Sequence, residues 1–158
     1  MAVDLHIHTA ASGDGEFSAR EIMQRAKEAQ LEAVAITDHD TVDSVEEAVY
    51  WGKKAGLEVI PGCEFSTVYQ DKWFHILGYF IDCQHSDIQA WCQMIEQARQ
   101  DNVDAQIARL CEAGFYIEKD KVLAGIWLSA NANLLWRCYF CRLPQRQKSG
   151  AEPLPVNG

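Results

Sequence analysis

Histidines and carboxylates recur where apolar segments in the first half of the chain end, a pattern that can bind metal ions. These groups are His6 and His8, then Asp38-His39-Asp40, then Cys63-Glu64, and finally His75 inside the run 73–80. Each group alone has an ordinary structural explanation, such as a helix cap or a half-exposed strand position. Together they would place many ionisable groups at one end of the fold, which is costly unless something pairs with them. The sequence therefore predicts a divalent metal cluster.

Alternating strands and helices would bring these groups together. The sequence predicts strands over 2–8, 33–37 and 57–60, a hairpin of 64–69 with 73–80, and helices over 19–30, 45–55 and 87–111. Strand, helix, strand, helix, strand at this spacing is typical of an α/β fold with parallel strands and outer helices. Reactive groups in such folds collect at the carboxyl ends of the strands, so the histidines and carboxylates should converge there.

Helix boundaries are indicated by local signals. Ser18 with Glu21, and Ser44 with Glu47, are capping-box pairs that predict the starts of the first two helices. Gly56 is expected to end the second helix in the left-handed conformation. The third helix is expected to be amphipathic and to end near residue 114.

Burial is predicted from the same pattern. The strand over 2–8 is mostly apolar and is expected to be buried. In the first helix, Ile22, Ala26 and Ala29 lie at helical spacing and should face the core. Pro61-Gly62 is expected to break the third strand, because proline and glycine are common strand terminators.

The composition is that of a globular domain. The chain has 158 residues, 48% of them hydrophobic and 23% charged, with a formal net charge of −9. This charge disfavours a general nucleic-acid-binding surface, which would be basic. The apolar run 122–128 is far shorter than the roughly 20 residues that a membrane-spanning helix needs. No signal-peptide pattern opens the chain, so a cytoplasmic location without membrane association is expected, with cysteines mostly reduced.

Residues 126–158 differ in character from residues 1–125. Residues 1–120 hold 9 basic and 22 acidic residues, a net charge of −13, whereas residues 121–158 carry a net charge of +4. We hypothesise that 126–158 is an atypical basic tail, truncated or frame-shifted relative to an ancestral sequence. The competing interpretation of Cys138 and Cys141 is half of a zinc site, although no second pair is present at comparable spacing.

Four motifs together resemble a known family. They are Asp4-Leu-His6-Ile-His8-Thr9, Thr37-Asp-His39-Asp-Thr41, Pro61-Gly-Cys-Glu64-Phe-Ser and His75-Ile-Leu-Gly-Tyr. In this order they closely resemble the PHP (polymerase and histidinol phosphatase) family of metal-dependent phosphoesterases. Within it, the chain is most similar to the branch that acts on nucleoside phosphates and short RNA 5′ ends. The resemblance covers about residues 3–125.

The resemblance implies a fold and a metal centre. The family fold is a distorted (β/α)7 barrel with up to three metals, commonly Mn, Fe, Zn or Mg, and residues 1–125 would be its N-terminal half. By likeness, the ligands would form three sets: His6 and His8 with Glu64, Glu64 with His75, and Asp14 with His39. A hydroxide held by the cations would attack phosphorus in line, because bound metals lower the pKa of water. The substrate would be a phosphorylated small molecule or a short oligonucleotide.

The chain also departs from the family pattern. Late ligands, a histidine in the second half and an Asp-x-His near the C-terminus, have no counterpart, since no histidine follows His85. His85 itself lies in a polar loop and is expected at the surface. One alternative is therefore a catalytically incomplete half-barrel that binds metal weakly without hydrolysis. Pairing of open sheet edges in a homo-oligomer could instead supply the missing ligands. A third alternative, an amidohydrolase, is disfavoured because no lysine is suitably placed at a strand end.

Overall fold

The computed structural model describes residues 2–115, so the predictions for 126–158, including the half zinc site, lie outside the described residues. The elements are β1 (Val3–Ile7), α1 (Ala19–Glu28), β2 (Ala33–Ile36), α2 (Val45–Ala55), β3 (Glu58–Tyr69), β4 (Lys72–Tyr79) and α3 (Ser86–Glu112). The predicted helices and hairpin are confirmed in order and type, and so are the predicted strands, except that the segments 57–60 and 64–69 form the single strand β3. The structure is mixed α/β, as expected.

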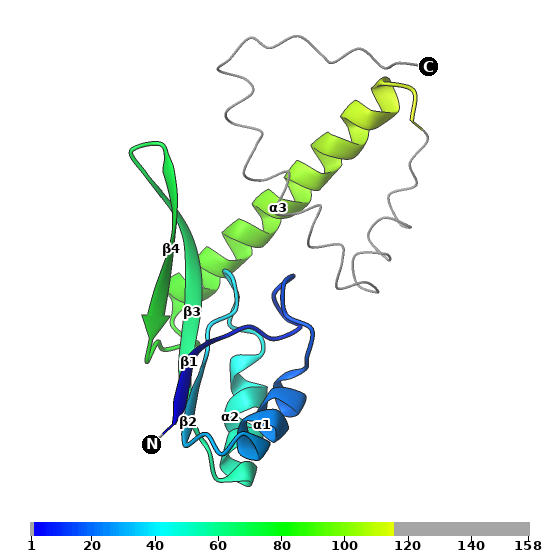
Figure 1. Cartoon of the computed structure of the whole chain (residues 1–158). Coiled ribbons are helices and arrows are strands. Elements are labelled where there is room, and N and C mark those ends of the chain that lie inside the picture. Colours follow the sequence, from blue (N-terminus) through cyan, green and yellow to red (C-terminus); the bar gives the residue numbers. More distant parts are fainter. Residues whose placement is uncertain (1, 116–158) are drawn as a thin grey trace.

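The four strands form one sheet in the order β1-β2-β3-β4, with α1 and α2 beside it (Figure 1). The pairs β1–β2 and β2–β3 are parallel, and β3–β4 is antiparallel. The parallel pairs follow from the helical crossovers between successive strands. This curled, mostly parallel sheet with helices outside is what a partial barrel requires.

The hydrophobic core lies between β2 and the two helices. All four residues of β2 are buried, with Val34 and Ile36 fully so. Ile22 and Ala26 of α1 are buried as predicted, and Met23 joins them. The prediction for Ala29 is wrong: it is the C-cap residue, beyond the last full turn, and it is exposed.

The caps differ between the two helices. Ser18 and Glu21 form the predicted capping box at the start of α1. Gly56 ends α2 with φ 75°, as predicted. The capping box predicted for Ser44 is wrong, because this side chain makes no capping hydrogen bond and donates instead to Asp38.

Pro61-Gly62 does not break the third strand, contrary to prediction. Residues 58–61 pair with β2 and residues 62–69 pair with β4, so this dipeptide lies where β3 changes partner. Proline costs no ladder bond at such a position. A Cβ on Gly62 would approach the Ile36 carbonyl oxygen to 2.9 Å and the Gly78 carbonyl oxygen to 2.8 Å. Glycine is therefore required for the two neighbouring strands to come so close.

The predicted burial of the strand over 2–8 is also wrong. Val3 is 46% exposed and Leu5 39% exposed. The strand lies at the edge of the sheet, and no other described element covers it on that side.

The hairpin has a two-residue turn, whereas the sequence predicted three connecting residues. Tyr69 pairs with Lys72, and the intervening Gln70 and Asp71 have φ of 49° and 59°. Two consecutive positive φ angles match the tight turns whose twist suits antiparallel strands. The hairpin extends past the ends of β1 and β2 (Figure 1).

His85 is the N-cap residue of α3, and its ring nitrogen Nδ1 accepts a hydrogen bond from the Asp87 backbone. His85 is exposed, in agreement with the prediction. The helix was expected to bury one face, but no residue of α3 is buried. It contacts the rest of the fold along its first half, where Trp91 packs edge-on against Phe65 and Arg99 pairs with Asp40. Among the described residues, no helix combines the length and the apolarity needed to cross a bilayer.

Candidate metal centre

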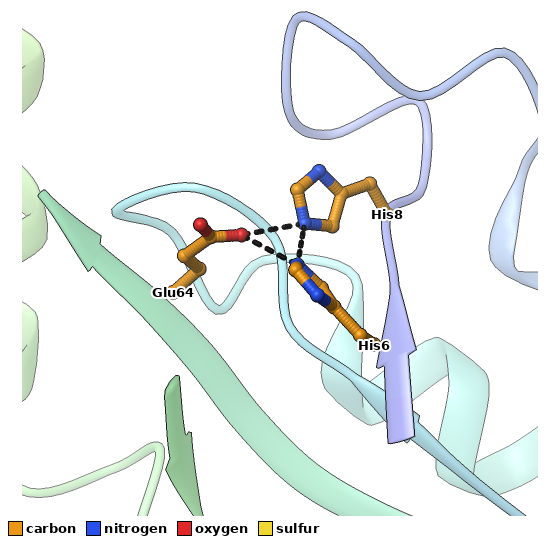
Figure 2. A group of neighbouring side chains, drawn as sticks. All are labelled: His6, His8 and Glu64. Carbon is orange, nitrogen blue, oxygen red and sulfur yellow. Dashed lines mark hydrogen bonds and ion pairs between the residues drawn. The ribbon is translucent and has the colours of Figure 1, made fainter. Parts of the chain in front are cut away.

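The six residues predicted as metal ligands all come together beyond the carboxyl ends of β1 and β2. The tightest group is His6, His8 and Glu64 (Figure 2). The Nε2 atoms of the two histidines are 3.1 Å apart, and each is 2.8 Å from Oε2 of Glu64. His6 on β1 and His8 just after it thus both contact the same carboxylate oxygen of Glu64 on β3.

The remaining three residues extend this group. Asp14 reaches His8 Nδ1 through Oδ1 at 2.9 Å and His39 Nε2 through Oδ2 at 3.2 Å. On the other side, His75 Nδ1 is 2.7 Å from Glu64 Oε1. Glu64 therefore uses one oxygen for the β1 histidines and the other for His75.

The donor atoms form three overlapping groups suitable for metal binding: His6, His8 and Glu64; His8, Asp14 and His39; His39, Glu64 and His75. The sequence predicted the same residues in slightly different sets, with His8 assigned to one set only. A neutral imidazole has one lone pair for a cation and one N–H to donate. When His8 Nε2 binds a cation beside Glu64, its Nδ1–H faces Asp14, a common outer partner of a metal-binding histidine.

These residues fit a divalent metal by chemistry and by spacing. A metal held at about 2.1 Å by each donor places neighbouring donors about 3.0 Å apart in octahedral geometry and about 3.4 Å apart in tetrahedral geometry. The separations of 2.8 and 3.1 Å in the His6, His8 and Glu64 group are close to the octahedral value. Mixed imidazole and carboxylate donors suit Mn, Fe or Zn.

Histidines and carboxylates of the cluster shift one another's pKa values. Burial favours the neutral ring of His8, but the hydrogen bond and charge of Asp14, with the charge of Glu64, raise its pKa. Burial opposes ionisation of Asp14, yet its hydrogen bonds to His39 and His8 outweigh this and hold its pKa far below the usual value. For Glu64, burial is likewise outweighed by His6, His39 and His8, and its pKa is lowered. The carboxylates are therefore ionised at neutral pH and ready to bind cations.

Asp38 belongs to the predicted polar cluster but does not face the metal-binding groups. Its fully buried carboxylate accepts hydrogen bonds from the Thr9 backbone at 2.6 Å and the Thr9 hydroxyl at 2.7 Å. It also accepts from Ser12 at 3.0 Å and from Ser44. Asp38 thus ties the loop carrying Asp14 to the end of β2. The hydroxyls after His8 were the sequence signal for this network, which sequence reasoning missed.

Asp40 fixes the other side of the His39 loop. Its backbone has φ 53°, and its carboxylate accepts from the Ser66 backbone and from Arg99 of α3, both at 2.8 Å. The backbones of Asp38 and Asp40 also exchange hydrogen bonds with Glu64 at 3.0 Å. His39 is therefore held between two anchored residues, directly beside Glu64.

A β-bulge aims His6 at the cluster. The register between β1 and β2 shifts between Asp4 and Ile7. The Leu5 carbonyl in this bulge accepts a hydrogen bond from the Tyr79 hydroxyl of β4 at 2.9 Å. Bulges commonly redirect a side chain next to a functional site. Here the curl of the sheet brings β4 close enough to hold it.

An open hollow of about 490 Å³ adjoins the cluster, lined by Asp4, His6, Ile7, His8, Asp14, Gly15, Glu16 and Phe17. The cluster is reached from this side, since the His6 side chain is 51% exposed whereas that of Glu64 is only 5% exposed. A ligand can therefore approach the histidines while the carboxylate stays shielded behind them.

Comparison with known proteins agrees with this geometry. The chain is 34% identical over 116 residues to a 5′-3′ exoribonuclease of Haemophilus influenzae, covering 73% of this chain and 39% of that protein. It is 30% identical over 125 residues to a phosphoribosyl 1,2-cyclic phosphate 1,2-diphosphodiesterase of Eggerthella lenta, covering 78% and 47%. The chain thus spans less than half the length of these relatives.

A solved structure from Bifidobacterium adolescentis, assigned as a metal-dependent phosphoesterase, shares the fold. It superposes with a TM-score of 0.69 at 31% identity, over 78% of this chain and 43% of the other. The model of the PHP domain family matches residues 4–121, which include all six residues of the cluster. The resemblance inferred from four motifs is confirmed: the chain belongs to the PHP domain family.

Proposed function

We propose that this chain hydrolyses phosphate esters of nucleotides or short RNA at a divalent metal centre held by His6, His8, Asp14, His39, Glu64 and His75. The observation that carries the proposal is Glu64, whose two oxygens lie within 2.8 Å of imidazole nitrogens from β1 and β4. Relatives named for RNA and phosphodiester substrates support this substrate class.

Bound cations would lower the pKa of a coordinated water and neutralise negative charge that develops on the phosphoryl oxygens. The residues of the chain have separate tasks around them. Glu64 lies between His6 and His8 on one side and His75 on the other, and its side chain is only 5% exposed. Asp14 accepts the Nδ1–H of His8 and so fixes which nitrogen of that ring is available to a metal. No side-chain nucleophile is needed.

The proposal also covers the metal, the catalytic segment and the cellular compartment. The donor set favours Mn, Fe or Zn, with Mg as a weaker candidate. Residues 1–125 are proposed as the catalytic unit, and the cytoplasm as its compartment. The open edge of β1 offers a surface through which a second chain could extend the sheet.

A hydrolysis assay on the full chain tests the proposal. A 5′-phosphorylated oligoribonucleotide is incubated with the chain and Mn²⁺, and Glu64→Gln is compared with Glu58→Gln, an exposed position on the same strand. Glu64→Gln should lose about 10- to 100-fold or more of the metal-dependent rate, the usual effect of disturbing a metal site. Glu58→Gln should match the wild-type chain. Equal rates in both variants would refute the proposal.

A second candidate is a half-barrel that binds metal but does not hydrolyse. The exposure of the edge strand β1 favours it. Stoichiometric metal binding that depends on Glu64, without hydrolysis of any phosphate ester, would select this candidate.

A further inference from the structure

The peptide group that joins Leu5 to His6 lies in the bulge of β1. At the register shift these two residues oppose a single residue of β2. A bulge of this kind disrupts the ladder locally and leaves the extra residue unpaired. The orientation of the Leu5–His6 peptide group therefore depends on contacts other than the regular ladder.

Side chains bond both polar atoms of this peptide group. The Leu5 carbonyl accepts a hydrogen bond from the hydroxyl of Tyr79, the last residue of β4, at 2.9 Å. The His6 backbone N–H donates to Oδ1 of Asp4 at 3.2 Å. The carbonyl and the N–H of one peptide lie in the same rigid plane. Two bonds at opposite edges of this plane fix its orientation, and with it the direction in which the His6 side chain leaves the strand.

His6 needs this support more than His8 does. The Nδ1 atom of His8 lies 2.9 Å from Asp14, a common kind of outer partner for a metal-binding histidine. The His6 ring contacts His8 and Glu64 through Nε2 (Figure 2), and within residues 2–115 no group bonds its Nδ1. Its side chain is 51% exposed, against 15% for His8. The position of the His6 ring thus depends mainly on its backbone.

Both bonding side chains are well placed for this role. His75 and Tyr79 are four residues apart on β4 and share a face of the strand. His75 contacts Glu64 at 2.7 Å, and Tyr79 contacts β1 directly. Asp4 adjoins the cluster but belongs to none of the three groups of donor atoms in the described part of the chain. Its bond to the His6 backbone therefore gives it a task other than metal binding.

We propose that Tyr79 and Asp4 are positioning residues of the metal centre, which hold the Leu5–His6 peptide group so that Nε2 of His6 stays beside Oε2 of Glu64. The inference rests on the proposed function and deepens it by naming two residues that support metal affinity without binding metal. A donor atom that is held in place beforehand loses less freedom when a cation binds. Removing either bond should therefore weaken metal binding while the fold stays intact.

The test measures the Mn²⁺ affinity of the full chain from the electron paramagnetic resonance signal of the free ion. Tyr79→Phe removes only the hydroxyl and should weaken binding about 10-fold, the lower end of the range for outer partners of metal ligands. Asp4→Ala should have a similar effect, whereas Asp4→Asn, which keeps a carbonyl acceptor, should retain most of the affinity. The matched control is Tyr69→Phe, whose hydroxyl contacts the neighbouring Gln70 at the hairpin turn. It should match the wild-type chain.

A thermodynamic cycle separates positioning of His6 from a general loosening of the fold. In His6→Ala the ring to be positioned is absent, so adding Tyr79→Phe should cause no further loss of Mn²⁺ affinity. An equal loss in that background, or no loss in Tyr79→Phe alone, would overturn the role of Tyr79. Equal losses in Asp4→Asn and Asp4→Ala would overturn the role of Asp4 as a hydrogen-bond acceptor.

Hydrogen exchange in the metal-free chain gives a second readout that does not need a bound ion. Exchange of the His6 amide, followed by nuclear magnetic resonance, should be about 10-fold faster in Tyr79→Phe and Asp4→Ala than in the wild-type chain or Tyr69→Phe. If the wild-type chain binds no Mn²⁺, the proposed function fails, and exchange alone decides the positioning role. It also decides that role if His6→Ala binds no Mn²⁺. Faster exchange in both variants supports the role, and unchanged exchange refutes it.

Discussion

Replacing Asp38 should destabilise the fold more than replacing any exposed carboxylate nearby. Its fully buried side chain accepts four hydrogen bonds, two from Thr9, one from Ser12 and one from Ser44. In Asp38→Asn, one oxygen becomes an amide that donates, so at least one buried donor loses its acceptor. Hydrogen bonds to a charged group contribute about 1.5–3 kcal/mol each. We expect the free energy of unfolding to fall by about 2–3 kcal/mol.

Asp38→Ala should cost more, about 3–5 kcal/mol, because the Thr9 backbone N–H is left buried without a partner and a small cavity forms. Domains are stable by only about 5–15 kcal/mol, so this loss is large. The assay is urea unfolding followed by far-ultraviolet circular dichroism, with Asp43→Asn, an exposed position of the same loop, as the control. A change within about 0.5 kcal/mol for Asp38→Asn would refute the assigned network.

Two further predictions concern packing and thiol chemistry. Gly52→Ala should lower the free energy of unfolding by about 1–3 kcal/mol, since its Cβ would lie 2.2 Å from Cγ2 of Val59. Urea unfolding measures this change, and a stabilised variant would contradict the packing of α2 on β3. Cys63 should react with a thiol reagent at pH 8 far more slowly than the exposed Cys111, because burial raises the pKa of the Cys63 thiol to about 12. Peptide mass spectrometry of labelled samples compares the two sites, and similar rates would contradict the burial of Cys63.

Most of the site could be predicted from sequence because strand ends fix where side chains go. His6 and His8 leave one face of a strand, and His39 and Glu64 follow or lie in neighbouring strands. Once the parallel sheet is recognised, their convergence follows from topology. The overlap of the groups through His8 depends on ring rotamers, which sequence spacing does not specify.

What sequence reasoning missed depends on tertiary context. Pro61-Gly62 is a common strand break, yet it lies inside β3 because the strand changes partner there. Ser44 has the local pattern of a helix cap, in which its oxygen would accept from backbone N–H groups of the helix. Its hydroxyl instead donates to the buried carboxylate of Asp38, and it makes no capping hydrogen bond. The burial of β1 was overestimated because hydrophobicity cannot indicate which neighbour covers a strand.

Metal analysis of the full chain tests the central claim most directly. The chain is equilibrated separately with Mn²⁺, Fe²⁺ and Zn²⁺, freed of unbound ions and analysed by inductively coupled plasma mass spectrometry, beside Glu64→Ala and the control Glu58→Ala. Since the donor atoms of His6, His8 and Glu64 converge on one point, we predict at least one tightly bound ion per wild-type chain, retained in Glu58→Ala and mostly lost in Glu64→Ala. No bound metal, or an equal content in Glu64→Ala, would contradict the account.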